Sequence, residues 1–161
     1  MKGNKLKMND DKTELITIGS KLKQVSTNSM VFQDCEIEFS KSVRNLGVFL
    51  DEFLSMEMQV NQLRKVLYFQ LRRISEIRSF LTVDASNTLA VAFILSRLDY
   101  CNSLLAGLPD HKLAKLQRIQ NSAARLVRRK QRRESATLLL TILHWLPVKA
   151  RIEYKVSTLC Y

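Results

Sequence analysis

Arginine and lysine are the side chains of this sequence whose type and spacing point most clearly to a function. Residues 112–133 contain nine of them and no Asp or Glu. Six of the nine are arginines, and the forked guanidinium group of arginine matches the oxygens of a phosphate. A run of like charges repels itself unless solvent or a polyanion screens it. The run therefore predicts either phosphate-backbone contacts or a solvated helix face, with an acidic membrane surface and a nuclear-import signal at 128–133 as minor alternatives.

Residues typical of catalysis or metal binding do not form a recognisable site in the sequence. His111 and His144 have no Cys or His at metal-ligand spacing, so we expect both to be structural. Asp10 and Asp11 resemble a carboxylate pair for a two-metal site, but turn chemistry in a polar segment explains them better. The sequence has no glycine-rich phosphate loop and no nucleophile elbow.

The composition restricts the class of protein. The 161 residues are 46% hydrophobic, too many for a disordered tail, and carry a net charge of +11. The excess is uneven, at +2 over residues 1–50 and +9 over residues 51–161. No apolar run approaches the roughly 20 residues of a membrane span, and the polar start predicts no secretory signal. The three cysteines are too far apart for a disulfide framework or a zinc site, so we expect an intracellular protein of the nucleus or cytoplasm.

Short strands are expected in the first fifty residues, where apolar positions alternate with polar ones or stand in β-branched runs. We expect strands at 14–18, 30–32, 35–39 and 43–50. Gly47 stands inside the last run, which predicts a bulge or a close approach of something else to the backbone.

Helical spacing begins at residue 53. Apolar residues three or four apart, from Met56 to Leu81, predict one long helix with Ser55 as its candidate N-cap. Further helices are expected at 84–105, after Pro109, at 135–144 and after Pro147. The centre of the second helix, residues 89–95, is apolar on all sides and predicts the buried helix of a bundle. The predicted fold class is therefore α+β and predominantly α.

Some side chains carry local expectations. Thr82 and Asp84 are candidate caps of the second helix. We expect Trp145 to be a hydrophobic anchor between the fourth and fifth helices, and Tyr100 and Cys101 to lie in the core.

Five segments of the sequence stand out: NDDKTEL at 9–15, VRNLGVFLD at 43–51, SRLDYCNSLLAGLP at 96–109, LQRIQNSAARL at 116–126 and LHWLPV at 143–148. In this order they resemble segments of reverse transcriptases of non-LTR (LINE-type, jockey-like) retrotransposons. From the first to the last they extend over most of the chain, from residue 9 to residue 148. The resemblance implies a late-palm and primer-grip remnant at 1–52, a helical thumb-like bundle at 53–133 and a truncated helical connector at 134–161.

The resemblance also implies site residues. Lys12 matches a lysine that lies near the incoming triphosphate and assists pyrophosphate departure, with a salt-bridged surface lysine as the alternative. Asn45 and Gly47 would belong to the primer grip. The thumb-like helices would hold an RNA/DNA template–primer duplex by its phosphates, with their arginines gathered on one concave face. The implied nucleic-acid-binding residues are Arg64, Arg72, Arg73, Lys115, Arg118, Arg125, Arg128, Arg129, Arg132 and Arg133.

The catalytic aspartates of the family precede the segment that matches residues 9–15, so we expect them to lie before the start of this chain. Two-metal phosphoryl transfer needs those carboxylates. We therefore expect no polymerase activity from this chain alone, no metal or cofactor here (Mg²⁺ belongs to the intact parent), and no membrane or small-molecule partner. An intact polymerase with its catalytic half in missing sequence is a weaker option. The alternative from another class is a helical protein-interaction or structural module with no nucleic-acid role.

Overall fold

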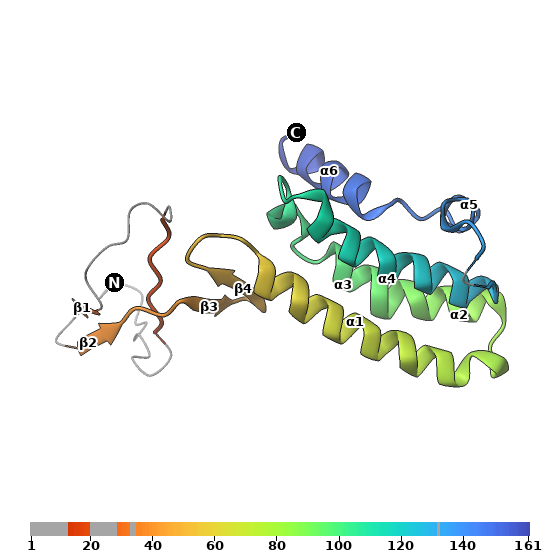
Figure 1. The fold of residues 1–161 in the computed structure, drawn as a ribbon, viewed down its shortest axis with the longest axis horizontal. Helices are drawn as coiled ribbons and strands as arrows, with labels where there is room; N and C mark the ends of the chain where they lie inside the picture. Colours follow the sequence, from red (N-terminus) through yellow and green to blue (C-terminus); the bar gives the residue numbers. More distant parts are fainter. Residues whose placement is uncertain (1–12, 20–28, 33–34, 132) are drawn as a thin grey trace. The chain divides into compact units, whose positions relative to one another are not determined.

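The structure is a computed structural model that describes residues 13–19, 29–32, 35–131 and 133–161. The chain divides into two compact units, Met1–Met58 and Gln59–Tyr161. The first contains two β-hairpins and the second is helical, so the fold is α+β and predominantly α, as predicted (Figure 1).

The first unit contains two antiparallel hairpins. In the first hairpin, β1 (Ser29–Phe32) pairs with β2 (Cys35–Glu38), and in the second, β3 (Ser42–Asn45) pairs with β4 (Val48–Asp51). The strands expected at 30–32 and 35–39 are thereby confirmed, and the run at 43–50 is two strands rather than one.

The strand expected at 14–18 is wrong. Leu15 makes a single parallel bridge to Phe39, and the Ser40 amide donates to the Leu15 carbonyl over 2.8 Å. The β-branched residues favour an extended chain, but a strand needs a partner along its length. Among the described residues, none pairs with this segment beyond that bridge.

Gly47 forms the turn between β3 and β4, so the expected bulge is wrong. Leu46 and Gly47 both have positive φ, at 46° and 84°, and they stand between the paired residues Asn45 and Val48. Two positive φ angles in a two-residue loop are typical of a type I′ hairpin turn, which favours glycine. A Cβ on Gly47 would meet no atom within 4 Å. The glycine therefore serves the backbone conformation of the turn.

The carboxylate of Asp51 binds the backbone just before the long helix α1 (Glu57–Ile77), a role that the sequence analysis did not predict. The Asp51 carboxylate accepts hydrogen bonds from the Ser55 and Met56 amides, each over 2.9 Å. Ser55, the predicted cap, accepts a longer bond of 3.3 Å from the Glu57 amide. Burial raises the pKa of Asp51, but the hydrogen bonds from Ser55 and Met56 outweigh it and hold the pKa below its ordinary value.

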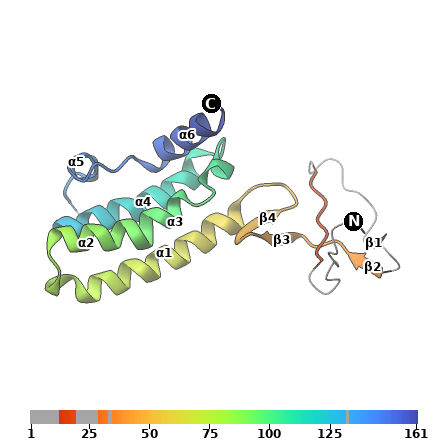
Figure 2. The ribbon, with the colours of Figure 1, turned by 180° about the vertical axis from the view of Figure 1, so that it is seen from behind.

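The second unit is a bundle around α4 (Asp110–Arg128), the helix predicted after Pro109. Short helical segments connect the end of α1 to α4, and α2, α5 and α6 pack against α4 (Figures 1 and 2). The other elements are η3 (Arg78–Phe80), α2 (Val83–Ala90), η4 (Val91–Leu95), α3 (Ser96–Asp99), η5 (Asn102–Leu105), α5 (Ala136–Ile142) and α6 (Val148–Leu159).

The helix predicted at 84–105 is interrupted and only half buried, which corrects the expectation of a helix buried on all sides. A π-helical turn, η4, separates α2 from α3. Ile94 and Leu95 are buried, whereas Val91 and Phe93 are 43% and 41% exposed. Because neighbouring helices cover one side of this segment, its apolar composition does not translate into full burial. The Thr82 side chain accepts from the Ala85 amide, as expected of an N-cap.

Side chains of α1, η4 and α4 contribute to the core of the bundle. Its fully buried side chains include Leu67, Ile94, Leu116 and Ile119. Trp145, between α5 and α6, is also buried, which confirms it as an anchor. In the described part of the chain, no helix is long and apolar enough to cross a membrane.

Tyr100 and Cys101 were expected in the core, and both are exposed. The helix ends just before them, at Asp99, and Cys101 adopts a left-handed conformation with φ of 52°. The chain turns there, so both side chains face solvent instead of continuing the buried stripe.

Candidate nucleic-acid interface

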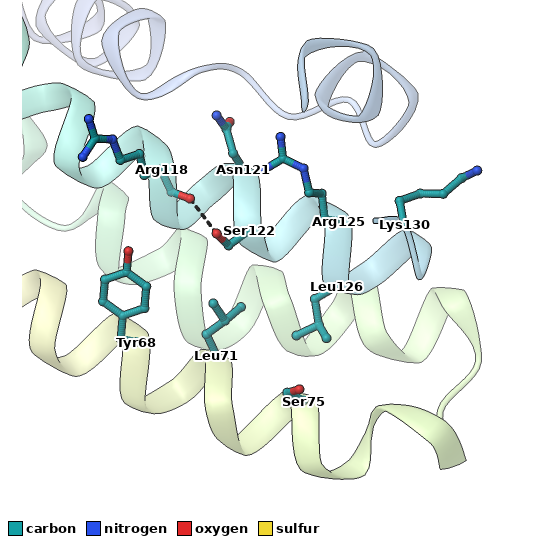
Figure 3. Close-up of a pocket in the computed structure, with 9 residues that line it drawn as sticks. All are labelled: Tyr68, Leu71, Ser75, Arg118, Asn121, Ser122, Arg125, Leu126 and Lys130. Atoms are coloured by element: carbon teal, nitrogen blue, oxygen red, sulfur yellow. Dashed lines mark hydrogen bonds between the residues drawn. The ribbon is translucent and has the colours of Figure 1, made fainter. Parts of the chain in front are cut away.

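Two adjoining recesses of the helical unit share Tyr68, Leu71 and Ser75 of α1. The first, of about 620 Å³, lies between α1 and α4 (Figure 3). The second, of about 750 Å³, continues along α1. We call the two recesses together the α1–α4 groove. Its other lining residues are Phe69, Arg72 and Glu76 of α1, and Arg118, Asn121, Ser122, Arg125, Leu126 and Lys130 of α4 and the turn after it.

Helical periodicity positions both walls of the groove. On α1, Tyr68, Leu71 and Ser75 are three and four residues apart, so they lie on one face beside the buried Leu67. On α4, Arg118 and Ser122 are four residues apart, and the Ser122 hydroxyl donates to the Arg118 carbonyl over 2.8 Å (Figure 3). The opposite face of α4 is anchored in the core, so its outer face is held firmly in place.

The α4 side of the groove is cationic. Among the described residues, Arg118, Arg125 and Lys130 line the first recess without a carboxylate, and Glu76 is the one acid that lines the second, beside Arg72. Lys130 pairs with Glu134 across 3.3 Å, and both side chains are more than 40% exposed. Such an exposed pair contributes little and exchanges readily with another anion.

Arg125 is partly engaged by the backbone. Its Nε and Nη2 donate to the Glu134 carbonyl oxygen over 3.2 and 3.1 Å. This anchors the guanidinium group at the α4 rim while the side chain still lines the recess. Arg118 lines the same rim.

The structure brings Arg72, Arg118 and Arg125 to one groove, but it leaves other predicted residues apart. Arg73 lies over the Phe69 ring, 5.8 Å from its centre, and lines a different recess beside Phe93. Five other predicted nucleic-acid-binding residues line neither part of the groove: Arg64, Lys115, Arg128, Arg129 and Arg133. Arg132 lies outside the described residues. Lys130, which does line the groove, was not among the predicted site residues.

Arg129 holds the fold together at the end of α4. Its Nη2 donates to the Arg78 and Ser79 carbonyls, each over 3.1 Å, and to Leu81 over 3.4 Å. This residue, predicted for nucleic-acid binding, is therefore engaged with the corner that leads from α1 to α2.

Arg78 returns the contact and was missed by sequence reasoning. It is 6% exposed and donates to the Leu126, Val127 and Leu81 carbonyls over 2.9, 2.6 and 2.8 Å. Burial and then the charge of Arg129 lower the pKa of the Arg78 guanidinium. Its position four residues after the buried Ile74 is the sequence signal that could have revealed it.

Three of the segments that carry the family resemblance meet in one hydrogen-bond network. Gln120, fully buried on α4, donates to the Leu146 carbonyl over 2.8 Å, and Gln117 accepts from the Val148 amide over 2.8 Å. Arg151 of α6 donates to the same Leu146 carbonyl and to the Asp99 carboxylate, over 2.8 and 2.6 Å. The network fixes the connection between α5 and α6 against α4, so these residues have a structural role.

The candidate site residues of the first unit are Asn45, Gly47 and Lys12, together with the Asp10–Asp11 pair. Asn45 and Gly47 are exposed at the turn of the second hairpin. Lys12, Asp10 and Asp11 lie outside the described residues. Among the described residues, no group of three or more His, Cys, Asp or Glu side chains is placed to hold a metal ion.

Comparison with protein-family models, curated proteins and solved structures found no match to this chain. The resemblance to reverse transcriptases therefore stays a prediction from the sequence. The geometry adds a groove with a cationic rim between α1 and α4.

Proposed function

We propose that this chain is a nucleic-acid-binding part of a non-LTR retrotransposon-type reverse transcriptase, whose helical unit holds a template–primer duplex by its phosphates. The observation that supports the proposal most is the α1–α4 groove, where Arg72, Arg118, Arg125 and Lys130 stand against one acid among the described lining residues. Phosphate contacts of this kind supply affinity without reading sequence.

Other parts of the proposal come from the resemblance alone. Lys12 would lie on the triphosphate side of the intact polymerase, and Asn45 and Gly47 would approach the primer end. Nucleotide incorporation would need carboxylates and Mg²⁺ supplied by the rest of the parent protein. The proposed location, the nucleus or cytoplasm, comes instead from the cysteine pattern.

The salt dependence of binding tests the proposal. Each phosphate that a cation neutralises releases a counterion, so four contacts predict a slope of log K against log salt of about −4 for a duplex. We expect this slope in filter binding of the full chain to an RNA/DNA template–primer duplex, with similar affinities for unrelated sequences. A flat salt response, or no binding at low salt, would remove the proposal.

A protein-interaction module is the second candidate, and a specific feature favours it. A recess of about 420 Å³ lies between α1 and the α2–η4 segment, and Phe69, Ile77 and Phe93 line it while remaining 41% or more exposed. Exposed apolar surface of this kind is typical of protein contacts. This candidate predicts that loss of the groove arginines leaves partner binding intact, whereas Phe93→Ala weakens it.

A further inference from the structure

Tyr68 is the aromatic side chain that lines both recesses of the α1–α4 groove. It is 45% exposed, although its neighbour Leu67 is fully buried. Figure 3 shows the ring beside the recess, on the α1 side, across from Arg118 and Ser122 of α4. An aromatic face left open next to arginines is the arrangement on which unpaired bases stack in proteins that bind single strands.

The cations of the opposite wall form a row rather than a ring. Arg118 and Arg125 are seven residues apart on α4, which corresponds to about 10 Å along the helix axis. Stacked nucleotides of one strand repeat about every 3.4 Å, so the two arginines span roughly three phosphates of a single backbone. Lys130 extends the row beyond the end of the helix.

The first recess is small compared with a double helix. It holds about 620 Å³, and Leu71 of α1 and Leu126 of α4 both line it. Pockets of about 300–1,000 Å³ are typical of small-molecule sites, so this recess suits one or two nucleotides of a single strand, whereas a duplex would contact only its rim.

Polar side chains complete the lining. Ser75 of α1 and Asn121 and Ser122 of α4 all line the first recess. Hydroxyl and amide groups of this kind hydrogen-bond to sugars and base edges of any sequence.

We infer that the α1–α4 groove binds a single nucleic-acid strand, with a base stacked on Tyr68 and the adjacent phosphates on Arg118 and Arg125. The inference rests on the proposed nucleic-acid function and adds to it the strand type and the base contact. In a template–primer complex, the duplex would lie on the cationic rim while an unpaired template segment enters the groove.

The test compares two fluorescein-labelled probes on the full chain by anisotropy: a ten-nucleotide oligo(dT) and a ten-base-pair blunt duplex. For Tyr68→Ala, we expect the ratio of single-strand to duplex affinity to fall about tenfold, because one stacked base is lost. Tyr68→Phe keeps an aromatic ring and should restore the ratio. Tyr154→Ala, which removes an exposed tyrosine of α6, is the matched control.

Two outcomes separate the inference from the proposal on which it rests. If the duplex binds with its salt slope but Tyr68→Ala and Tyr154→Ala give the same ratio as the unaltered chain, the inference is overturned and the proposed function stands. If neither probe binds at low salt, both fail. Melting curves that match the unaltered chain exclude misfolding of the variants as the cause.

Discussion

At the scale of single residues, Arg78 and Arg129 connect two ends of helices by exchanging hydrogen bonds. The Arg78 guanidinium group donates to carbonyls near the C-terminus of α4, and the Arg129 guanidinium group donates to carbonyls of η3, directly after α1. Carbonyls at a helix C-terminus lack partners within the helix, and cations there also suit the helix dipole. Two like charges are therefore tolerated close together, because both lie against carbonyl oxygens.

Replacing Arg78 with Met should destabilise the bundle by about 2 kcal/mol. The change removes the buried guanidinium group that donates to the Leu126 and Val127 carbonyls, and methionine supplies no donor in its place. The measurement is urea denaturation followed by circular dichroism. Arg97→Met, at an exposed position of α3, is the control and should stay within about 0.5 kcal/mol. Equal midpoints for the two variants would contradict the structural role of Arg78.

Asp51 gives the start of α1 a dependence on pH. Its pKa is lowered below 3.8 in the folded chain, so the stabilisation is present above that value and is lost as the pH falls through the folded pKa. In hydrogen exchange at pH 7, Asp51→Asn should lower protection of the Ser55 and Met56 amides about tenfold, the equivalent of a hydrogen bond to a charged group.

Below the folded pKa of Asp51, the protection factors of these two amides should converge in the unaltered chain and in Asp51→Asn. Amides elsewhere in α1, such as that of Leu67, provide the internal reference. Protection at Ser55 and Met56 that is the same in both chains at pH 7 would show that the carboxylate does not hold the start of the helix.

At the scale of elements, the π-helical turn η4 decides which apolar residues of its segment face the core. Leu95 is 3% exposed and Val91, one turn earlier, is 43% exposed. Leu95→Asp should cost about 4 kcal/mol because it buries an unpaired charge, whereas Val91→Asp should cost less than about 1 kcal/mol. Thermal melting of both variants measures the difference, and similar melting temperatures would mean that the assigned core face is wrong.

The elements were predictable where periodicity and capping agreed. The spacing from Met56 onward and the Thr82 cap identified α1 and α2, and the charge run identified the basic end of α4. The π-helical turn and the exposed Tyr100 were not predictable, because burial depends on which side of a helix its neighbours cover. The sequence indicated that Gly47 has an unusual backbone conformation. It did not indicate the turn, in which two consecutive residues have positive φ angles, because apolar residues recur through residues 43–50 as in a single strand.

The candidate site was only partly predictable for a related reason. Sequence reasoning identified Arg72, Arg118 and Arg125 by their charge. It did not foresee that Arg129 would bond to backbone carbonyls, because the partners are about fifty residues away in the chain. Lys130 and Tyr68 were missed because their contribution arises from the recess between α1 and α4.

At the scale of the whole molecule, the net charge of +11 raises the question of whether any nucleic-acid binding is local or diffuse. A strongly basic protein attracts polyanions at long range whatever its surface shape. The proposed function requires most of the binding affinity to come from the α1–α4 groove. Arg72 lines this groove from α1 and Arg118 lines it from α4. A test must therefore hold the net charge constant while it changes the groove.

The most direct measurement compares two double variants of equal charge across a salt series with a template–primer duplex. Arg72→Gln with Arg118→Gln removes one cation from each helix of the groove, and Arg97→Gln with Lys155→Gln removes two exposed cations of α3 and α6. We expect the first pair to weaken binding to all sequences alike and to reduce the salt slope by about 2, and the second to change it little. Equal losses in the two double variants would contradict the groove as the binding site.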